Sequence, residues 1–285
     1  MTPITLQGAL YQPLKRYIYP PAGEPGAMEE DLARTISTQA EKLTGQLEVQ
    51  PELHFVTSTM LTNTFTRGHL DWARLVKRCE KHDALPPATF LNGYECAGWG
   101  YILRYLEQLG GTRRVLISIV DVNIYDYEYW KHNSNWGHSG FGIGTLLLEL
   151  GEGPEQAVDV CAFNSANPVA DFAMAIRRRL TAEKTRLAAL PFFPEATQPL
   201  FDRTLGTFTR LPDRHSQWGH CFGSDPWLSL ILSREKLQTA NSDTGVLVCS
   251  LAFSGYYALA RITVPPAAAL RLEAPLEGWP LKEVI

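Results

Sequence analysis

Several features that would assign a function directly are missing from this sequence of 285 residues. Basic residues show no excess, because 26 Lys and Arg stand against 30 Asp and Glu, a net charge of −4, which argues against a nucleic-acid-binding protein. No apolar run reaches the length that spans a bilayer, and the first residues lack the basic and then apolar layout of a secretory signal. The sequence therefore predicts a cytoplasmic protein that neither crosses a membrane nor binds nucleic acid.

Cysteine is too sparse and too irregularly spaced for a structural framework. The five cysteines are odd in number and include no Cys-x-x-Cys pair, so neither a disulfide scaffold nor a zinc ribbon is expected. His132, Asn133, Asn135 and His138 form a polar cluster, but no third histidine or carboxylate lies at a spacing familiar from zinc sites. The aromatic residues around this cluster favour a loop at a substrate entrance or a dimer contact. We expect no metal site and a reducing compartment.

What the sequence does contain is an alternation of helices and strands in both halves. Hydrophobic residues make up 45% of the chain, enough for a large core. Apolar spacing predicts helices over 28–47, 70–79, 97–109, 169–188, 195–205 and 225–237. Runs rich in β-branched residues predict strands over 53–57, 88–91, 113–121, 140–150, 158–163, 246–251 and 257–264. The alternation favours an α/β protein with two similar halves, 1–165 and 166–285, divided at the Asn-Ser-Ala-Asn-Pro segment.

One cysteine occupies a position suited to nucleophilic chemistry. Cys96 stands between a short strand and the first turn of the apolar helix 97–109. The positive end of the helix dipole favours the thiolate there, and the backbone N–H groups can hold an oxyanion. Most buried cysteines are nevertheless inert, so the residues alone leave both interpretations open.

Four segments in the same order resemble the ketoacyl-ACP synthase III enzymes and, more broadly, the thiolases. Glu-Cys-Ala-Gly-Trp-Gly resembles the nucleophile segment, and Gly-Phe-Gly-Ile-Gly-Thr resembles a glycine-rich strand in which Phe141 replaces an aspartate. Trp-Gly-His-Cys-Phe-Gly resembles a loop that carries asparagine in synthase III and histidine in thiolases. The last segment resembles the glycine-rich loop before the final strand. The segments span residues 95–103, 139–149, 218–227 and 251–257.

The resemblance implies a fold and a set of roles. The fold would be the five-layered αβαβα thiolase fold, built from two similar halves. Cys96 would be the nucleophile and His220 the general base and acid, although His220 could instead only cap a helix or bond a backbone carbonyl. An N–H of the Phe253–Gly255 loop, at Ser254 or Gly255, would complete the oxyanion site. No cofactor is implied, since the acyl group arrives as a thioester of CoA or of a carrier protein's phosphopantetheine.

One departure from the family bears on the reaction. Synthase III and the thiolases place a polar residue in a segment that corresponds here to Phe193-Pro194-Glu195-Ala196-Thr197, where Pro194 takes the polar position. Decarboxylative condensation needs that second donor, and losing one such donor typically costs roughly 10²–10³ in rate. The sequence therefore favours acyl transfer over chain elongation.

Three weaker candidates for substrate binding remain. Glu95 and Trp99 flank the nucleophile and could line the acyl pocket, although Glu95 could also pair with a neighbouring cation. Arg178 belongs to a basic stretch that could dock an acidic carrier protein or a phosphate. A solvated helix face explains Arg178 equally well.

Three functions are compatible with the sequence. The first is a ketosynthase-III-like acyltransferase of fatty acid, polyketide or other specialised metabolism, acting as a homodimer or in a ketosynthase-like heterodimer. The second is a non-catalytic partner subunit of such a heterodimer, which the short chain and Pro194 favour and the intact Cys96 and His220 oppose. The third is a binding protein that senses acyl-CoA.

Overall fold

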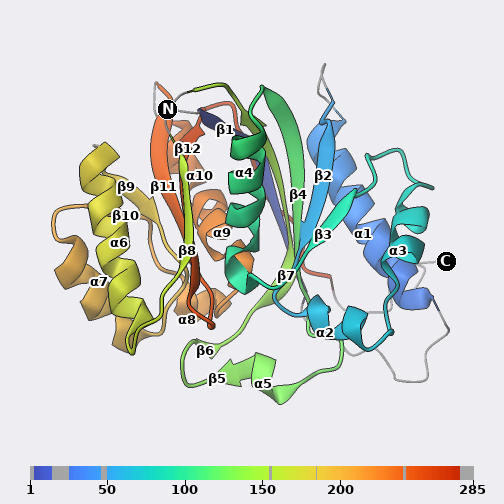
Figure 1. Cartoon of the computed structure of the whole chain (residues 1–285), viewed down its shortest axis with the longest axis horizontal. Helices are drawn as coiled ribbons and strands as arrows, with labels where there is room; N and C mark the ends of the chain where they lie inside the picture. Colours follow the sequence, from blue (N-terminus) through green and yellow to red (C-terminus); the bar gives the residue numbers. More distant parts are fainter. Residues whose placement is uncertain are drawn as a thin grey trace.

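The computed structural model describes residues 3–14, 26–45, 50–153, 156–183, 185–239 and 242–276 (Figure 1). In the first part of the chain the elements are β1 (Ile4–Leu14), α1 (Ala27–Thr44), β2 (Leu53–Thr57), α2 (Leu61–Thr66), α3 (Trp72–Cys79), β3 (Thr89–Leu91), η1 (Glu95–Ala97), α4 (Gly98–Leu109), β4 (Arg113–Asp121), α5 (Glu128–Lys131), β5 (His132–Asn133), β6 (Gly137–His138) and β7 (Phe141–Leu150).

The second part begins with β8 (Val158–Ala162) and α6 (Pro168–Glu183). It continues with β9 (Leu187–Ala189), η2 (Glu195–Thr197), α7 (Gln198–Leu205), β10 (Thr209–Arg210), α8 (His215–Trp218), η3 (Phe222–Ser224), α9 (Asp225–Leu232), α10 (Arg234–Gln238), β11 (Thr244–Leu251), β12 (Tyr256–Val264) and β13 (Ala269–Leu272).

The strand order is the same in the two parts of the chain. In the first part it is β1-β7-β4-β2-β3, with β1–β7 and β7–β4 antiparallel and the other two pairs parallel. In the second part it is β8-β12-β11-β9-β10, with the same sequence of antiparallel and parallel pairs. Ten of the described strands thus form two five-stranded units of one topology, as expected for two similar halves, while β13 pairs with β1 and β5 pairs with β6.

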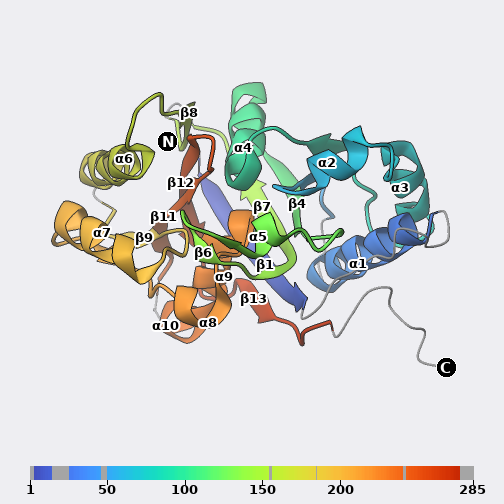
Figure 2. The same ribbon diagram turned by 90° about the horizontal axis from the view of Figure 1, so that it is seen from below.

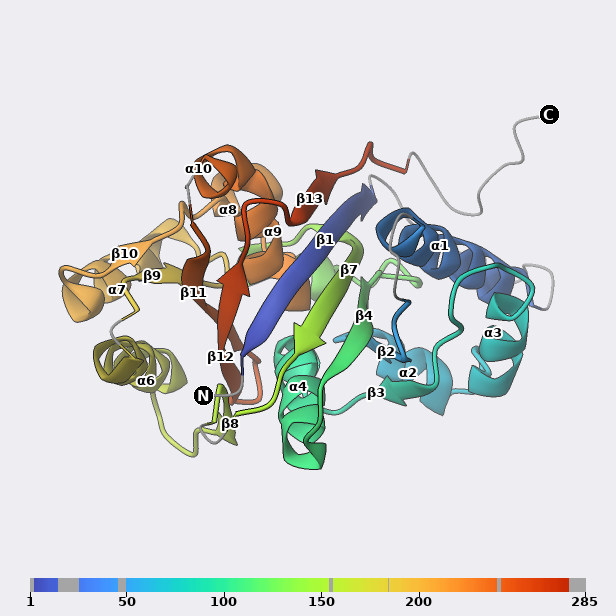
Figure 3. The ribbon, with the colours of Figure 1, turned by 90° about the horizontal axis from the view of Figure 1, so that it is seen from above.

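The two units meet at the centre of the molecule. Strands β1 and β12 run parallel there and are joined at Thr5 and Thr263 (Figure 3). The repeat of the strand order begins at β8, slightly before the division predicted at residue 165, which itself stays a prediction. Helices α6 and α7 cover one outer face, and α1 and α3 cover the other (Figure 1). With α4 and α9 between the two units, the molecule has the five layers expected.

Helix α4 approaches the strands closely because Gly98 and Gly100 stand in its first turn. A Cβ on Gly98 would lie 2.0 Å from Thr57 Oγ1 of β2, and one on Gly100 would lie 2.2 Å from Ala258 Cβ of β12. The helix therefore touches both units, and Trp99 packs edge-on against Trp227 of α9, with ring centroids 5.0 Å apart. This contact joins the two central helices in the main core.

Most sequence-predicted elements are present, with shifted ends. The strand predicted over 113–121 has those bounds in β4. The helix predicted over 169–188 is too long, because α6 ends at Glu183 and Leu187–Ala189 pairs with β11 as β9. Leucine and alanine favour helices by themselves, but strand pairing overrides that preference here.

Candidate active site

Cys96 lies in η1, two residues before the start of α4, and it is 4% exposed. The preceding residue, Glu95, has a φ of 47°, in the left-handed region that residues other than glycine seldom adopt. The local turn therefore places the sulfur at the head of α4, as the sequence predicted. Thr59, just after β2, donates its hydroxyl to Cys96 Sγ at 3.7 Å.

His220 reaches the sulfur from the other unit. Its Nε2 lies 3.8 Å from Cys96 Sγ, and its side chain is buried. The backbone of His220 is fixed by two hydrogen bonds, from its N–H to His138 O and from the N–H of Gly140 to its O. Gly219 makes this close pairing possible, because its φ is 70° and a Cβ would lie 2.8 Å from His138 O.

Asp225, the first residue of α9, places a carboxylate against the other nitrogen of the His220 ring. Its Oδ2 lies 2.5 Å from His220 Nδ1, on the opposite side of the ring from the sulfur. The carboxylate also accepts the N–H of Phe192 at 2.9 Å and the N–H of Cys221 at 2.6 Å, and it is fully buried. Burial alone lowers the pKa of His220, but the charges of Asp225 and Asp121 outweigh it and raise that pKa. The arrangement matches a thiol, an imidazole base and a carboxylate that orients the base.

A second buried carboxylate, that of Asp121, fixes two backbone segments beside the site. Asp121, at the end of β4, accepts the N–H of Thr59 at 2.7 Å and the N–H of Gly223 at 3.1 Å. It thereby joins the segment after β2 to the turn that carries Phe222 and Ser224. Burial raises the pKa of Asp121 to about 6, despite these hydrogen bonds.

The electrostatics of Cys96 differ from the sequence-based expectation. Burial raises the pKa of the thiol well above its ordinary value, and the charges of Asp121, Glu95 and Asp225 raise it further, while the Thr59 hydrogen bond opposes them. Burial and these carboxylates therefore oppose the stabilisation of the thiolate that was expected from the helix end. The thiol has to lose its proton to a base during the reaction.

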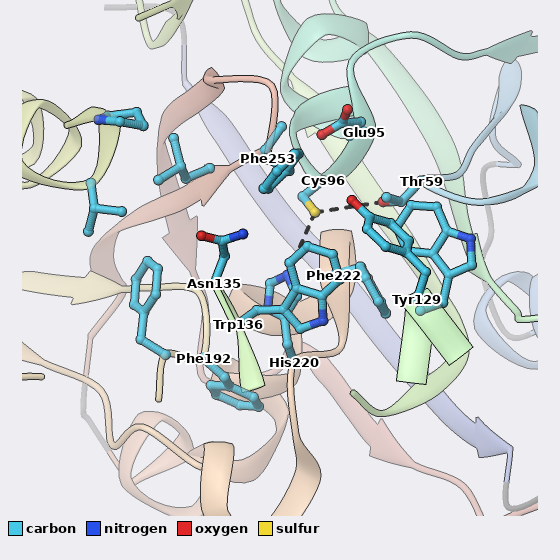
Figure 4. A pocket seen from close by; sticks show the side chains of 16 residues that line it. Thr59, Glu95, Cys96, Tyr129, Asn135, Trp136, Phe192, His220, Phe222 and Phe253 are labelled. Carbon is cyan, nitrogen blue, oxygen red and sulfur yellow. Dashed lines mark hydrogen bonds between the residues drawn. The ribbon is translucent and has the colours of Figure 1, made fainter. Parts of the chain in front are cut away.

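The sulfur opens into a pocket of about 170 Å³. Figure 4 shows Cys96 and His220 among its lining side chains, with Glu95 on the far side of the sulfur from His220 in this view. Most of the lining is apolar and aromatic: Tyr129, Trp130, Trp136, Pro168, Val169, Phe192, Phe193, Phe222, Leu251, Ala252 and Phe253. An apolar cavity of about 150 Å³ holds a benzene molecule, so this pocket has room for a short or aromatic acyl group.

The segment between β4 and β7 covers the pocket. Seen from below (Figure 2), α5 and β6 lie across the centre of the molecule. Trp136 is buried, donates its Nε1–H to Ser139 Oγ at 2.9 Å and lies with its ring 6.1 Å from that of His220. The prediction that this aromatic loop lines a substrate entrance agrees with the position of Trp130 and Asn135 in the pocket wall.

Comparisons with known proteins find solved structures of similar fold. No protein-family model matches the chain, and no curated protein matches it by sequence. A 3-oxoacyl-(acyl-carrier protein) synthase from Burkholderia xenovorans superposes with a TM-score of 0.63 at 11% identity, over 95% of this chain and 97% of that one. ChlB3, described as an acyltransferase, gives 0.61 at 13% identity, over 92% and 98%. The tetronic acid condensing enzyme AbyA1 gives 0.59 at 16% identity, over 90% and 99%.

This chain has the thiolase-like fold of the 3-oxoacyl-ACP synthase III structures. The fold expected from the sequence resemblance is thereby confirmed. In this thiolase-like chain, Cys96 and His220 come from different units and meet at the base of the pocket, and Glu95 lies in its wall.

Two predicted substrate-binding residues lie outside the pocket. Trp99 is fully buried in the core, where its Nε1–H donates to Ser250 Oγ at 2.8 Å, so its prediction as a pocket residue is wrong. Arg178 lies on the exposed side of α6. Of that helix, only Pro168 and Val169 line the pocket. Arg178 lies ten residues after Pro168, which is about 15 Å along the helix. Carrier docking on this helix stays a prediction.

The two backbone N–H groups that were predicted to bind the oxyanion already have acceptors within the protein. The N–H of Ser254 donates to Glu95 Oε2 at 3.3 Å, and the N–H of Gly255 donates to Ala252 O at 3.0 Å. Both predicted donors are thus engaged within the protein. The other N–H of the predicted loop is that of Phe253, whose side chain lines the pocket.

The segment that was expected to offer Pro194 contributes differently. Phe192 and Phe193 line the pocket, whereas Pro194 packs beside Gly137. The consequence drawn from the sequence is unchanged, because this segment presents only apolar side chains to the sulfur. Sequence reasoning missed Asp225, Asp121 and Thr59, whose side chains come from separate segments.

Two further observations concern metal binding and membrane insertion. Among the residues that the structure describes, no cluster of three or more His, Cys, Asp or Glu side chains is arranged as metal ligands are. Within the same residues, no helix combines the length and the apolar character needed to cross a membrane.

Proposed function

We propose that this protein is an acyltransferase that forms an acyl thioester on Cys96 and passes the acyl group to an acceptor. One observation carries the proposal. The Cys96 sulfur and the His220 imidazole lie in contact at the base of an apolar pocket, and the buried Asp225 carboxylate lies against the other nitrogen of the imidazole. A buried thiol without a base would be inert, but this one has a base at contact distance and a third group that orients the base.

The first half of the reaction follows from this geometry. His220 Nε2 takes the thiol proton while Cys96 Sγ attacks the thioester carbonyl of the donor. The N–H groups of Cys96 and Phe253 are the proposed donors to the tetrahedral oxyanion. The carbon–sulfur bond to the donor then breaks, and the imidazolium gives its proton to the departing thiolate. Asp225 stabilises the imidazolium during this cycle.

The apolar lining favours transfer over decarboxylative condensation. A second polar group would be needed to hold the enolate oxygen as carbon dioxide leaves. The segment that carries this group in synthase III and the thiolases places Phe192 and Phe193 in the pocket here, so Thr59 and Asn135 are the polar side chains left in the lining besides Glu95 and His220. The donor would be a thioester of CoA or of a carrier protein, in fatty acid, polyketide or other specialised metabolism. Assembly as a homodimer or as a ketosynthase-like heterodimer belongs to the same proposal.

Intact-mass spectrometry tests the proposal. The purified chain is incubated with acetyl-, butyryl-, hexanoyl- and benzoyl-CoA and weighed. We expect one acyl adduct that is absent from Cys96→Ala and present in Cys161→Ala, because Cys161 is an exposed thiol that does not line the pocket. The proposal fails if the adduct persists in Cys96→Ala, or if no adduct forms with CoA or carrier-protein donors. Lack of an adduct together with a stable complex to a full-length ketosynthase would support the partner-subunit alternative.

A further inference from the structure

Glu95 has an unusual position for a residue that only supports the nucleophile. It directly precedes Cys96, yet both side chains face the same pocket. This orientation depends on its left-handed backbone, with a φ of 47°, a conformation that is strained in a residue other than glycine. His220 is buried at the base of the pocket, whereas Glu95 is only partly buried, so a molecule entering from solvent meets Glu95 first.

The charges around the sulfur are mostly negative. Glu95 lies in the pocket wall, and the carboxylates of Asp121 and Asp225 lie behind it. Among the described residues that line the pocket, none is Lys or Arg, and His220 supplies the one cationic group available there. The influence of Glu95 also reaches two lining groups, since its charge contributes to the raised pKa of Cys96 and of Tyr129. Such a site repels an anionic acceptor and attracts a cation.

One hydrogen bond holds the Glu95 carboxylate in place. Ser254 donates its N–H to Oε2 at 3.3 Å, which fixes the side chain beside the Ala252–Gly255 turn. An ionised carboxylate has about four lone-pair sites, so this one hydrogen bond leaves capacity for an ammonium group.

We propose that the acceptor of the acyl group is an amine, and that Glu95 binds its ammonium form and removes the proton that blocks attack. This inference rests on the acyl-Cys96 intermediate of the proposed function. Glu95 takes one proton from R–NH₃⁺, and the neutral nitrogen attacks the acyl carbonyl on Cys96. The carbon–sulfur bond then breaks, the second nitrogen proton passes through His220 to the Cys96 sulfur, and an amide leaves. Glu95 finally releases its proton to solvent.

The test separates transfer from acylation. Wild type, Glu95→Gln and Glu95→Ala are first acylated with the CoA thioester that gives the Cys96 adduct, and are then mixed with benzylamine or with benzyl alcohol, a neutral molecule of similar shape. Loss of the adduct and formation of the amide are followed by mass. Glutamine keeps an oxygen that accepts the Ser254 N–H, and the discharge rate of each variant is measured on its own isolated adduct, so it does not depend on how fast that adduct formed.

In wild type, benzylamine should discharge the adduct faster than benzyl alcohol. In Glu95→Gln, discharge by benzylamine should fall roughly 10²-fold, the usual contribution of a general base. The remaining rate should rise about tenfold per pH unit, because it depends on the free amine in solution, whereas wild type should show a shallower rise.

Three results would overturn the inference. Glu95→Gln could discharge its adduct at the wild-type rate and with the wild-type pH profile. Benzyl alcohol could be as good an acceptor as benzylamine. Glu95→Ala could lose acylation while Glu95→Gln keeps both steps, which would make Glu95 only a support for the loop. Absence of any Cys96 adduct in wild type instead contradicts the proposed function, and this inference with it.

Discussion

Replacement of Asp225 by asparagine tests whether the buried carboxylate serves the reaction. Asparagine has nearly the same shape but no charge. At an effective dielectric constant of about 20, unit charges about 4 Å apart attract each other by about 4 kcal/mol. Asp225 Oδ2 lies 2.5 Å from His220 Nδ1, so the imidazolium loses a large stabilisation. Burial, which lowers the pKa of His220, is then opposed mainly by Asp121.

A weaker base lowers the rate of Cys96 acylation. General bases contribute about 10²–10⁴ in rate, so Asp225→Asn should acylate Cys96 about 10²-fold more slowly or worse. Because the pKa of Cys96 is raised by burial and by nearby carboxylates, the residual rate should keep rising with pH across the neutral and mildly alkaline range. The measurement is the rate of adduct formation with an acyl-CoA, followed by mass at several pH values.

Asp213→Asn provides the matched control. Asp213 also accepts two backbone N–H groups, from Phe193 at 3.0 Å and from His215 at 2.8 Å. Either variant leaves one N–H without its carboxylate acceptor, at a cost of about 1–3 kcal/mol. Asp213→Asn should therefore share the loss of stability but keep the acylation rate. Acylation of Asp225→Asn within about threefold of wild type, or an equal loss in both variants, would refute the reasoning.

Three other predictions concern the surroundings of the sulfur. Trp136→Ala should uncover Cys96 and speed its alkylation by iodoacetamide several-fold, as followed by peptide mass mapping; an unchanged rate would mean that Trp136 is no cover. The raised pKa of Asp121, about 6 against an ordinary 3.8, favours its protonated form in the folded chain. Its contribution to stability should therefore fall by about 3 kcal/mol as pH rises from about 4 to about 6, and urea unfolding of Asp121→Asn should lack this component. Gly100→Ala should destabilise the fold by roughly 1–3 kcal/mol, since the new Cβ meets Ala258, whereas Gly245→Ala, with no atom within 4 Å, should change little in the same urea assay.

The parts of the site that the sequence predicted are those fixed by local geometry. A cysteine before an apolar helix and a histidine after Gly219 are each placed by a turn that a few residues specify. The segments that carry them resemble one family in the same order along the chain, and this resemblance predicted that Cys96 and His220 meet across the two units. The catalytic roles of Cys96 and His220 remain predictions that the acylation experiment tests.

The parts that could not be predicted depend on contacts between distant segments. Asp225 reads as an ordinary first residue of a helix, and only the η3 turn, in which Phe222 adopts a φ of 53°, brings its carboxylate back to His220. Asp121 ends a buried strand, and nothing in its neighbourhood along the chain indicates that Thr59 and Gly223 will donate to it. The prediction for Trp99 was wrong for a different reason. Its motif suggested the pocket, whereas the apolar character of its helix indicated the core, where it lies.

The resting site keeps its nucleophile in the thiol form. Burial and the carboxylates of Asp121, Glu95 and Asp225 raise the pKa of the thiol well above its ordinary value. A buried thiol of this kind resists oxidation and stray alkylation, since the thiolate is the reactive form. It becomes a nucleophile only when His220 takes its proton, and the resulting imidazolium is the species that Asp225 stabilises. Asp121 and Asp225, which suppress the free thiolate, therefore also stabilise the charge that appears on His220 during the reaction, which links the protection of Cys96 to its proposed catalysis.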